Sequence, residues 1–130
     1  MKKWPRLEYC PCCGLPSLTS RGFDEICSVC WWQDDGQDDP HADEVWGGPN
    51  EDYSLTQARE NFVQHGHMYR AGAGSAWVEN PDEERRELLE YVRATALGSV
   101  QFDLMVFAAL LLREKSAKES DDLIAEFEDE

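Results

Sequence analysis

The sequence predicts an α+β protein, with a small zinc-ribbon-like β module at the N-terminus and a helical segment of about three to four helices after it. The first observation is a pair of C-x2-C motifs among short β-type segments within the first 33 residues. The second is a helical spacing of apolar residues, with capping signals, from residue 54 onward. We expect a zinc-binding cysteine-rich domain with an acidic loop and a first helix over residues 1–70. A helical extension should follow over residues 77–130, after the small and flexible AGAGSA stretch.

The β module is expected to contain two strands, LTSRGF at 18–23 and EICSVCWW at 25–32, paired as a hairpin or ribbon. Residues 33–53 are rich in Gly, Pro, Asn and Asp, and their apolar residues have neither a helical nor an alternating period. We therefore expect an ordered or semi-ordered loop there, with Trp46 as an anchor onto the core.

The first helix is expected to begin after Ser54, because Gln57 follows three residues later in a capping-box arrangement, and to end at Gly66. A second helix should open at Asn80-Pro81-Asp82-Glu83 and end near Gly98. The apolar residues expected to be buried by these two helices are Leu55, Ala58, Phe62, Leu88, Leu89, Tyr91 and Val92.

A third helix should run from about Ser99 into the 110s. Its centre, LMVFAALLL, is apolar nearly all round, so we expect this helix to be central to the core or shared with another subunit. Asp121 is expected to cap a short acidic helix at the C-terminus.

Four of the five cysteines form the pattern Cys10-x2-Cys13-x13-Cys27-x2-Cys30. A C-x2-C pair makes a tight turn that brings both sulfurs to one metal ion, and two such pairs give a tetrahedral site of four thiolates, which suits zinc. Because four thiolates fill every coordination position, we expect one structural Zn²⁺ held by these four residues.

Two alternatives concern the same cysteines. Iron is the minor one, since rubredoxin-type turns also use CPxCG. Thioredoxin-like redox chemistry would require a βαβ context that the sequence lacks. Cys12 lies between two ligands in CPCCG and is expected to be a small residue packed in the turn, with a reactive thiol or a spare ligand as the other readings.

The chain is strongly acidic, with 12 Lys and Arg against 27 Asp and Glu and a formal net charge of −15. No Lys or Arg lies between Arg21 and Arg59, whereas ten carboxylates do. Such a surface repels phosphate backbones, which argues against nucleic-acid binding, and it attracts basic proteins. The competing explanation is that the charge only keeps a small protein soluble.

No run of 18 apolar residues exists, and the longest, VFAALLL at 106–112, is too short to cross a bilayer. The N-terminal MKKWPRLEYCPCCG has no apolar segment after its lysines, so no signal peptide is expected. We therefore expect a cytoplasmic protein in a reducing compartment, where cysteines bind metal rather than form disulfides.

Three ordered motifs resemble the cysteine-rich CPCC domain family: CPCCG at 10–14, ICSVCWWQDDGQ at 26–37 and GGPNEDYSLTQARENF at 47–62. Ser28 and Gln33 stand where the family pattern commonly has Pro and an acidic residue, but neither departure removes a metal ligand. The resemblance covers roughly residues 9–66. It implies a small bacterial zinc-bearing domain with no established catalytic activity, and some similar proteins are thought to act as immunity proteins beside secreted toxins.

The leading hypothesis is therefore a non-enzymatic binding protein that blocks a toxin domain with a basic cleft, such as a nuclease. The expected contacts are Asp34, Asp35, Asp38, Asp39, Asp43 and Glu44, with Trp32 or Trp46 as a hydrophobic anchor. Of the adjacent Trp31 and Trp32, one is expected to cover the zinc site or the core.

The alternative is a zinc-ribbon regulator or assembly factor that acts as a homodimer through its apolar third helix. No Ser-His-Asp order, P-loop or dinucleotide fingerprint appears, so we expect no enzyme. His41, His65 and His67 have no obvious third ligand nearby, and we expect no second metal site.

Overall fold

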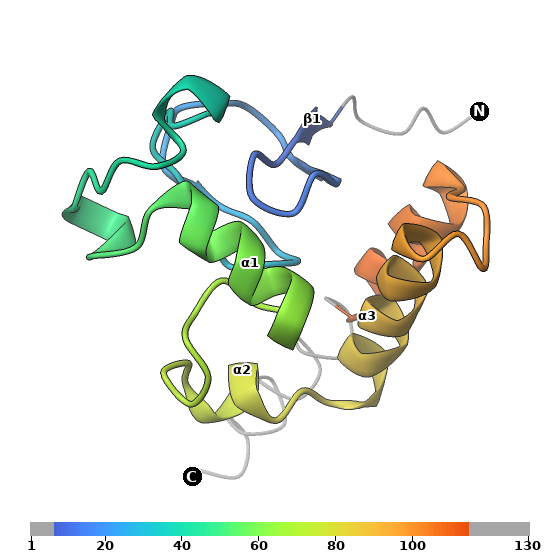
Figure 1. Cartoon of the computed structure of the whole chain (residues 1–130). Helices are drawn as coiled ribbons and strands as arrows, with labels where there is room; N and C mark the ends of the chain where they lie inside the picture. Colours follow the sequence, from blue (N-terminus) through green and yellow to red (C-terminus); the bar gives the residue numbers. More distant parts are fainter. Residues whose placement is uncertain (1–6, 115–130) are drawn as a thin grey trace, which may run out of the picture. The chain divides into compact units, whose positions relative to one another are not determined.

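The computed structural model describes residues 7–114, apart from the side chain of Trp77, and the chain divides into two compact units, Met1–Ser75 and Ala76–Glu130 (Figure 1). The C-terminal helix expected after Asp121 lies outside the described residues.

The first unit begins with two small antiparallel hairpins. Strand β1 (Glu8–Tyr9) pairs with β2 (Pro16–Leu18), and β3 (Glu25–Ile26) pairs with β4 (Gln33–Asp34). Helices follow these hairpins along the chain, which confirms the predicted α+β class.

The two predicted strands were wrong in detail. Residues 19–23 lie between β2 and β3 without strand structure, and residues 27–32 form a turn followed by irregular chain. The physical reason is that each C-x2-C motif occupies the tip of its own hairpin, so a strand cannot continue through the second motif. The hairpin partners are therefore the residues flanking each motif rather than residues 18–23 and 25–32.

The acidic loop, residues 33–53, is ordered around two 3₁₀ turns, η1 (Asp39–His41) and η2 (Gly48–Asn50). The buried Asn50 amide ties the end of the loop to its start: it accepts a hydrogen bond from the Gln33 N–H at 3.1 Å and donates one to the Gln33 carbonyl at 2.7 Å. The Asn50 side chain thus satisfies the Gln33 backbone as a neighbouring strand would, and it joins the two ends of the loop.

Helix α1 (Leu55–His65) has the predicted capping box. The Ser54 hydroxyl accepts from the Gln57 N–H at 3.1 Å, the Gln57 side chain accepts from the Ser54 N–H at 3.2 Å, and Gly66 ends the helix in the left-handed conformation. Leu55 and Ala58 are buried, as expected, whereas Phe62 is half-buried. The fully buried apolar residues of this unit come from the hairpins, α1 and the chain after it: Leu18, Val29, Trp32, Leu55, Ala58 and Met68.

The second unit contains α2 (Ala76–Glu79), α3 (Glu83–Ala96) and a helix over residues 104–114. Helix α3 begins two residues later than a cap at Asn80 would place it, because Asp82 is the residue whose side chain accepts from a helical N–H, that of Arg85, at 2.9 Å. Leu88 and Val92 are buried, while Leu89 and Tyr91 are half-buried.

The last described helix begins at residue 104 rather than near Ser99, because the Asp103 carboxylate accepts from the N–H groups of Met105 and Val106. The Tyr91 hydroxyl contacts Asp103, and Arg113 pairs with Glu87 at 2.7 Å, so this helix returns antiparallel to α3. Within the described part of the chain, no helix is long and apolar enough to span a membrane.

Candidate metal centre

Each C-x2-C motif forms a compact turn with the same backbone pattern. In the first turn, the Cys10 carbonyl accepts from the Gly14 N–H at 2.8 Å, and the Cys10 N–H donates to the Leu15 carbonyl at 2.9 Å. The Cys12 N–H points at the Cys10 sulfur, 3.4 Å away, which leaves an amide positioned to stabilise a thiolate.

The second turn repeats this arrangement 17 positions later in the chain. The Cys27 carbonyl accepts from the Trp31 N–H at 3.0 Å, and the Cys27 N–H donates to the Trp32 carbonyl at 2.8 Å. The Val29 N–H lies 3.3 Å from the Cys27 sulfur. The two turns are therefore structural equivalents, each able to present two sulfurs to one ion.

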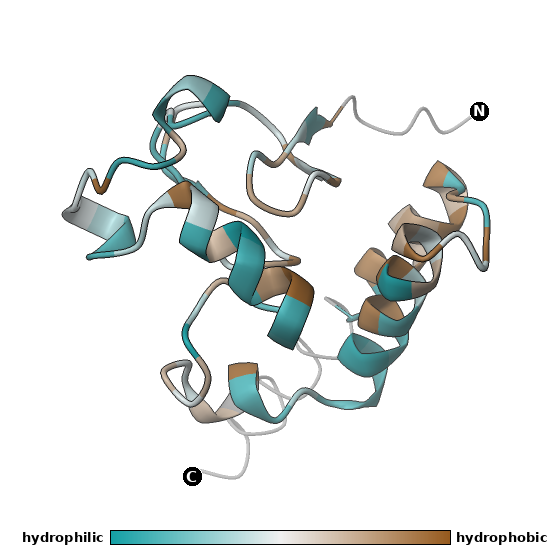
Figure 2. Cartoon of the chain, viewed as in Figure 1, coloured by the Kyte–Doolittle hydropathy of each residue, from teal (hydrophilic) through white to brown (hydrophobic). Residues whose placement is uncertain are grey.

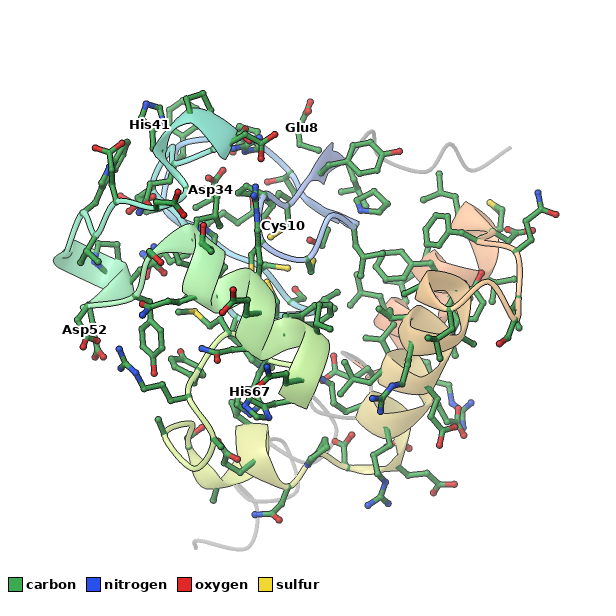
Figure 3. All side chains as sticks on the ribbon, in the orientation of Figure 1. Glu8, Cys10, Asp34, His41, Asp52 and His67 are labelled. Atoms are coloured by element: carbon green, nitrogen blue, oxygen red, sulfur yellow. The ribbon has the colours of Figure 1, made fainter. Side chains whose placement is uncertain are left out.

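The two turns bring their four sulfurs together. Figure 3 labels Cys10, which lies among yellow sulfur atoms beneath the hairpins. The Cys10 and Cys30 sulfurs are 3.6 Å apart, those of Cys13 and Cys27 are 3.7 Å apart, and all four lie within 4.8 Å of one another. Zinc–sulfur bonds of about 2.3 Å arranged tetrahedrally place sulfurs roughly 3.8 Å apart. The donor set and its spacing therefore fit one metal ion, as the sequence predicted for these four residues.

Three of the four cysteines are buried and Cys13 is half-buried, and the loss of solvent changes the acidity of their thiols. Hydrogen bonding within the cluster and loss of solvent raise the pKa of Cys13 well above its usual value, and loss of solvent raises that of Cys30. Burial also acts to raise the pKa of Cys27, but hydrogen bonds from the other cluster thiols and from Ser17 outweigh it, so this pKa lies well below normal. A positive metal ion would favour the thiolate form at all four positions.

Ser17 is a part of the centre that the sequence analysis missed. Its hydroxyl, on the buried strand β2, lies 2.9 Å from the Cys27 sulfur, close enough to donate a hydrogen bond to a thiolate. Strand β2 leads away from the first turn, so the first hairpin supplies a hydrogen bond to a ligand of the second. No sequence spacing announces this contact, because it depends on how the two hairpins meet.

Later segments of the unit hold both turns in place. The Arg59 guanidinium, from α1, donates to the Pro11 carbonyl at 2.8 Å, and the Met68 N–H donates to the Cys30 carbonyl at 2.9 Å. Helix α1 and the chain after it thus contact one turn each. The metal centre is therefore joined to the whole first unit rather than to its hairpins alone.

Cys12 lies beside this centre without belonging to the group of four. It is 7 % exposed, and its sulfur is absent from the set that lies within 4.8 Å of one another. All five cysteines are free in the structure. The expected packing of Cys12 in the turn agrees with this burial.

Two of the expected partner contacts were wrong. Trp32 and Asp34 are fully buried, so neither is presented at the surface. Trp32 belongs to the core, while the neighbouring Trp31 is half-buried. Asp34 accepts from the Arg21 guanidinium at 2.9 Å and from the Gly22 N–H at 2.7 Å, which gives it a structural role.

The other acidic residues expected to contact the partner differ in whether their carboxylates already have partners within the chain. Asp38 pairs with Arg21 at 3.0 Å, Asp39 with Arg59 at 2.6 Å, and Asp43 accepts from Thr56 at 2.6 Å. Asp35 is half-buried and accepts from Gln37 and Asn50. Glu44 is exposed, and neighbouring Val45 and Trp46 are 56 % and 45 % exposed, so this tip of the acidic loop offers a charge and apolar surface together.

The histidines do not add a second centre among the described residues. Only the four cysteines form a group of at least three His, Cys, Asp or Glu side chains that could share a metal ion in this part of the chain. The His65 and His67 rings lie 5.6 Å apart, and His41 contacts Trp46 at 5.1 Å between ring centroids. His41 therefore packs against the exposed tip of the acidic loop.

Two C-x2-C turns converging on four thiols define a small protein whose cysteines lie close enough to bind one metal ion. The chain belongs to the Cysteine-rich CPCC family, whose model matches residues 8–85, more than half of the 130 residues. The match includes both hairpins, the acidic loop and α1, and it reaches the first residues of α3. Comparison with curated proteins and with solved structures gave no significant match.

Proposed function

We propose that this protein is a non-enzymatic, zinc-stabilised binding protein of the cytoplasm, and that its acidic loop binds and blocks a basic toxin domain as an immunity protein does. The zinc part rests on the donor set. Four cysteine sulfurs satisfy the tetrahedral preference of Zn²⁺ and leave no position for a reacting water, so the ion would serve the fold. Metal analysis of the purified protein distinguishes zinc from iron.

The binding part rests on one observation above all: the acidic loop is held in a defined shape while its tip stays exposed. The Asn50–Gln33 pair, the Asp39–Arg59 pair and the contacts of Arg21 fix the loop to the hairpins and α1. A surface ordered before binding loses less conformational entropy on association than a disordered one. Glu44, Val45 and Trp46 then combine charge with an aromatic anchor, as protein interfaces often do.

The chemistry of the surface selects the kind of partner. No Lys or Arg lies between Arg21 and Arg59, and Arg21 and Arg59 are themselves paired with loop carboxylates. The surface therefore remains negative and attracts a basic surface with a hydrophobic pocket. The substrate cleft of a nuclease has this character, because it binds phosphates, and carboxylates can occupy it in their place.

The test is co-expression with a candidate toxin domain, taken from a secreted protein encoded directly beside this gene. We expect the protein to restore growth and to form a complex whose dissociation constant rises with salt concentration. The double variant Glu44→Gln, Trp46→Ala should weaken binding at least tenfold, whereas the matched variant Glu90→Gln, Phe23→Ala, which changes an exposed acid and an exposed aromatic elsewhere, should bind normally.

Binding that is independent of salt, or equal for the two double variants, would refute the role of the acidic loop. If the protein restores growth with none of the toxin domains encoded beside its gene, the immunity function is refuted. Both measurements use the full chain with its metal, and circular dichroism confirms that the variants are folded.

A further inference from the structure

The helix over residues 104–114 is apolar on two faces, only one of which is buried. Phe107, Ala108 and Leu111 form the buried face. Met105, Ala109 and Leu112 are exposed, and their spacing of four and then three residues places them in one line along the helix. We call these three residues the apolar stripe. Figure 2 shows the same helix mostly in the brown of hydrophobic residues.

The turn before this helix enlarges the exposed apolar surface. Leu97 is 74 % exposed, and Val100 and Phe102 are also exposed, as is Val106 in the helix itself. From Ala94 to Leu112 the only charged residue is Asp103, in a chain whose formal net charge is −15. An uncharged apolar region of this extent on so acidic a protein indicates an interaction surface.

We propose that the apolar stripe binds a second copy of this chain, forming a two-fold symmetric dimer. The stripe is self-complementary: a small residue, Ala109, separates two large ones. If two antiparallel copies of the helix cross at Ala109, Met105 of one copy packs against Leu112 of the other, and each contact occurs twice. Arg113, at the end of the helix, is already paired with Glu87 and leaves no unmatched cation beside the stripe.

Charge favours a second copy at this face over other occupants. Two chains of net charge −15 repel each other over most of their surface, and the uncharged region is where they can approach. The chain's own residues 115–130 contain seven acidic residues, so covering the stripe with them would bring charge onto it. A basic partner, in contrast, is attracted to the acidic loop.

The exposed area sets the strength to expect. Large apolar side chains that are about half exposed leave roughly 100 Å² each for contact, so the stripe and the turn provide on the order of 600 Å² per copy. A standard interface uses about 800 Å² per partner. The dimer should therefore be weak, with a dissociation constant on the order of micromolar.

The test is sedimentation velocity of the full, metal-loaded chain under reducing conditions, which prevent intermolecular disulfides. We expect the dimer fraction to rise with protein concentration and also with salt, because salt screens the repulsion between two acidic chains. Ala109→Glu places two like charges at the centre of the interface and should abolish the dimer. Leu112→Gln should weaken it at least tenfold, and Val63→Glu, a matched apolar-to-acidic change on an exposed site of α1, should leave it unchanged.

A monomer at every concentration overturns the proposal, and so does a dimer that Ala109→Glu leaves intact. If the wild type is monomeric and Ala109→Glu lowers its free energy of unfolding, the chain covers the apolar stripe itself. That result also overturns the dimer proposal. The dimer is independent of the proposed function: salt strengthens the dimer but weakens binding to a basic toxin, and the two depend on different residues.

Discussion

Trp31 adopts a left-handed backbone conformation that residues other than glycine rarely adopt. Its φ is 74°, the same value as that of Gly14, which occupies the equivalent position of the first turn. A left-handed non-glycine residue costs about 1–2 kcal/mol. The second turn tolerates this cost because the backbone hydrogen bonds of Cys27 with Trp31 and Trp32 hold the turn in the shape that brings Cys27 and Cys30 together. The geometry of the centre thus overrides local preference.

The same centre allows the role of each cysteine in CPCCG to be tested. We expect Cys12→Ser to retain one metal ion per chain and its fold, because the Cys12 sulfur lies outside the group of four. Cys10→Ser should lose both, since a structural zinc site contributes of order 10 kcal/mol or more in small domains. Native mass spectrometry gives the metal content and circular dichroism the fold. Metal loss from Cys12→Ser would show that the ligand assignment is wrong.

The structural role of Asp34 can be tested by substitution. Its buried carboxylate holds Arg21 and the Gly22 N–H, so Asp34→Ala would leave these donors without their acceptor. We expect a loss of about 2–3 kcal/mol in the free energy of unfolding, since Arg21 is partly exposed and solvent offsets some of the cost. Glu44→Ala, at an exposed acid of the same loop, should change stability by less than about 0.5 kcal/mol. Equal effects in chemical denaturation would contradict the structural role of Asp34.

Local sequence signals specified some elements well and others poorly. The capping box at Ser54 and the stop at Gly66 were predicted correctly because both act within four residues of the helix end. The strands were not, because a two-residue strand such as β3 has no periodicity to detect and exists only as the stem of a metal-binding turn. The burial of Asp34 could not be predicted either, since its partner Arg21 lies 13 residues away.

The N-terminal cap of helix α1 can be tested by substitution. Ser54→Ala removes the hydroxyl that accepts from the Gln57 N–H, and we expect a loss of about 1 kcal/mol in the free energy of unfolding. Ser54→Asp retains an acceptor and should recover most of the loss. Gln64→Ala, an exposed position near the other end of the helix, is the matched control. Equivalent stabilities of Ser54→Ala and Ser54→Asp in urea denaturation would exclude the capping contribution.

The two units of the chain depend on different forces for their stability. The first unit surrounds the four cysteines, and its hairpins have strands of only two or three residues, which are marginally stable on their own. The second unit is a helical hairpin held by apolar contacts, the Tyr91–Asp103 hydrogen bonds and the Glu87–Arg113 pair, and the metal ligands all lie in the first unit. We therefore expect metal binding to stabilise the first unit much more than the second.

Removing the metal tests this division directly. Treating the full chain with a strong chelator should release one ion and unfold the first unit, with a large change in tryptophan fluorescence because Trp32 leaves the core. Much of the helical circular dichroism should remain, since α3 and residues 104–114 hold no metal ligand. Readdition of Zn²⁺ should restore the fluorescence, and Cys12→Ser should behave like the wild type. A single transition in which fluorescence and helicity are lost together would instead show that the metal centre stabilises the entire chain.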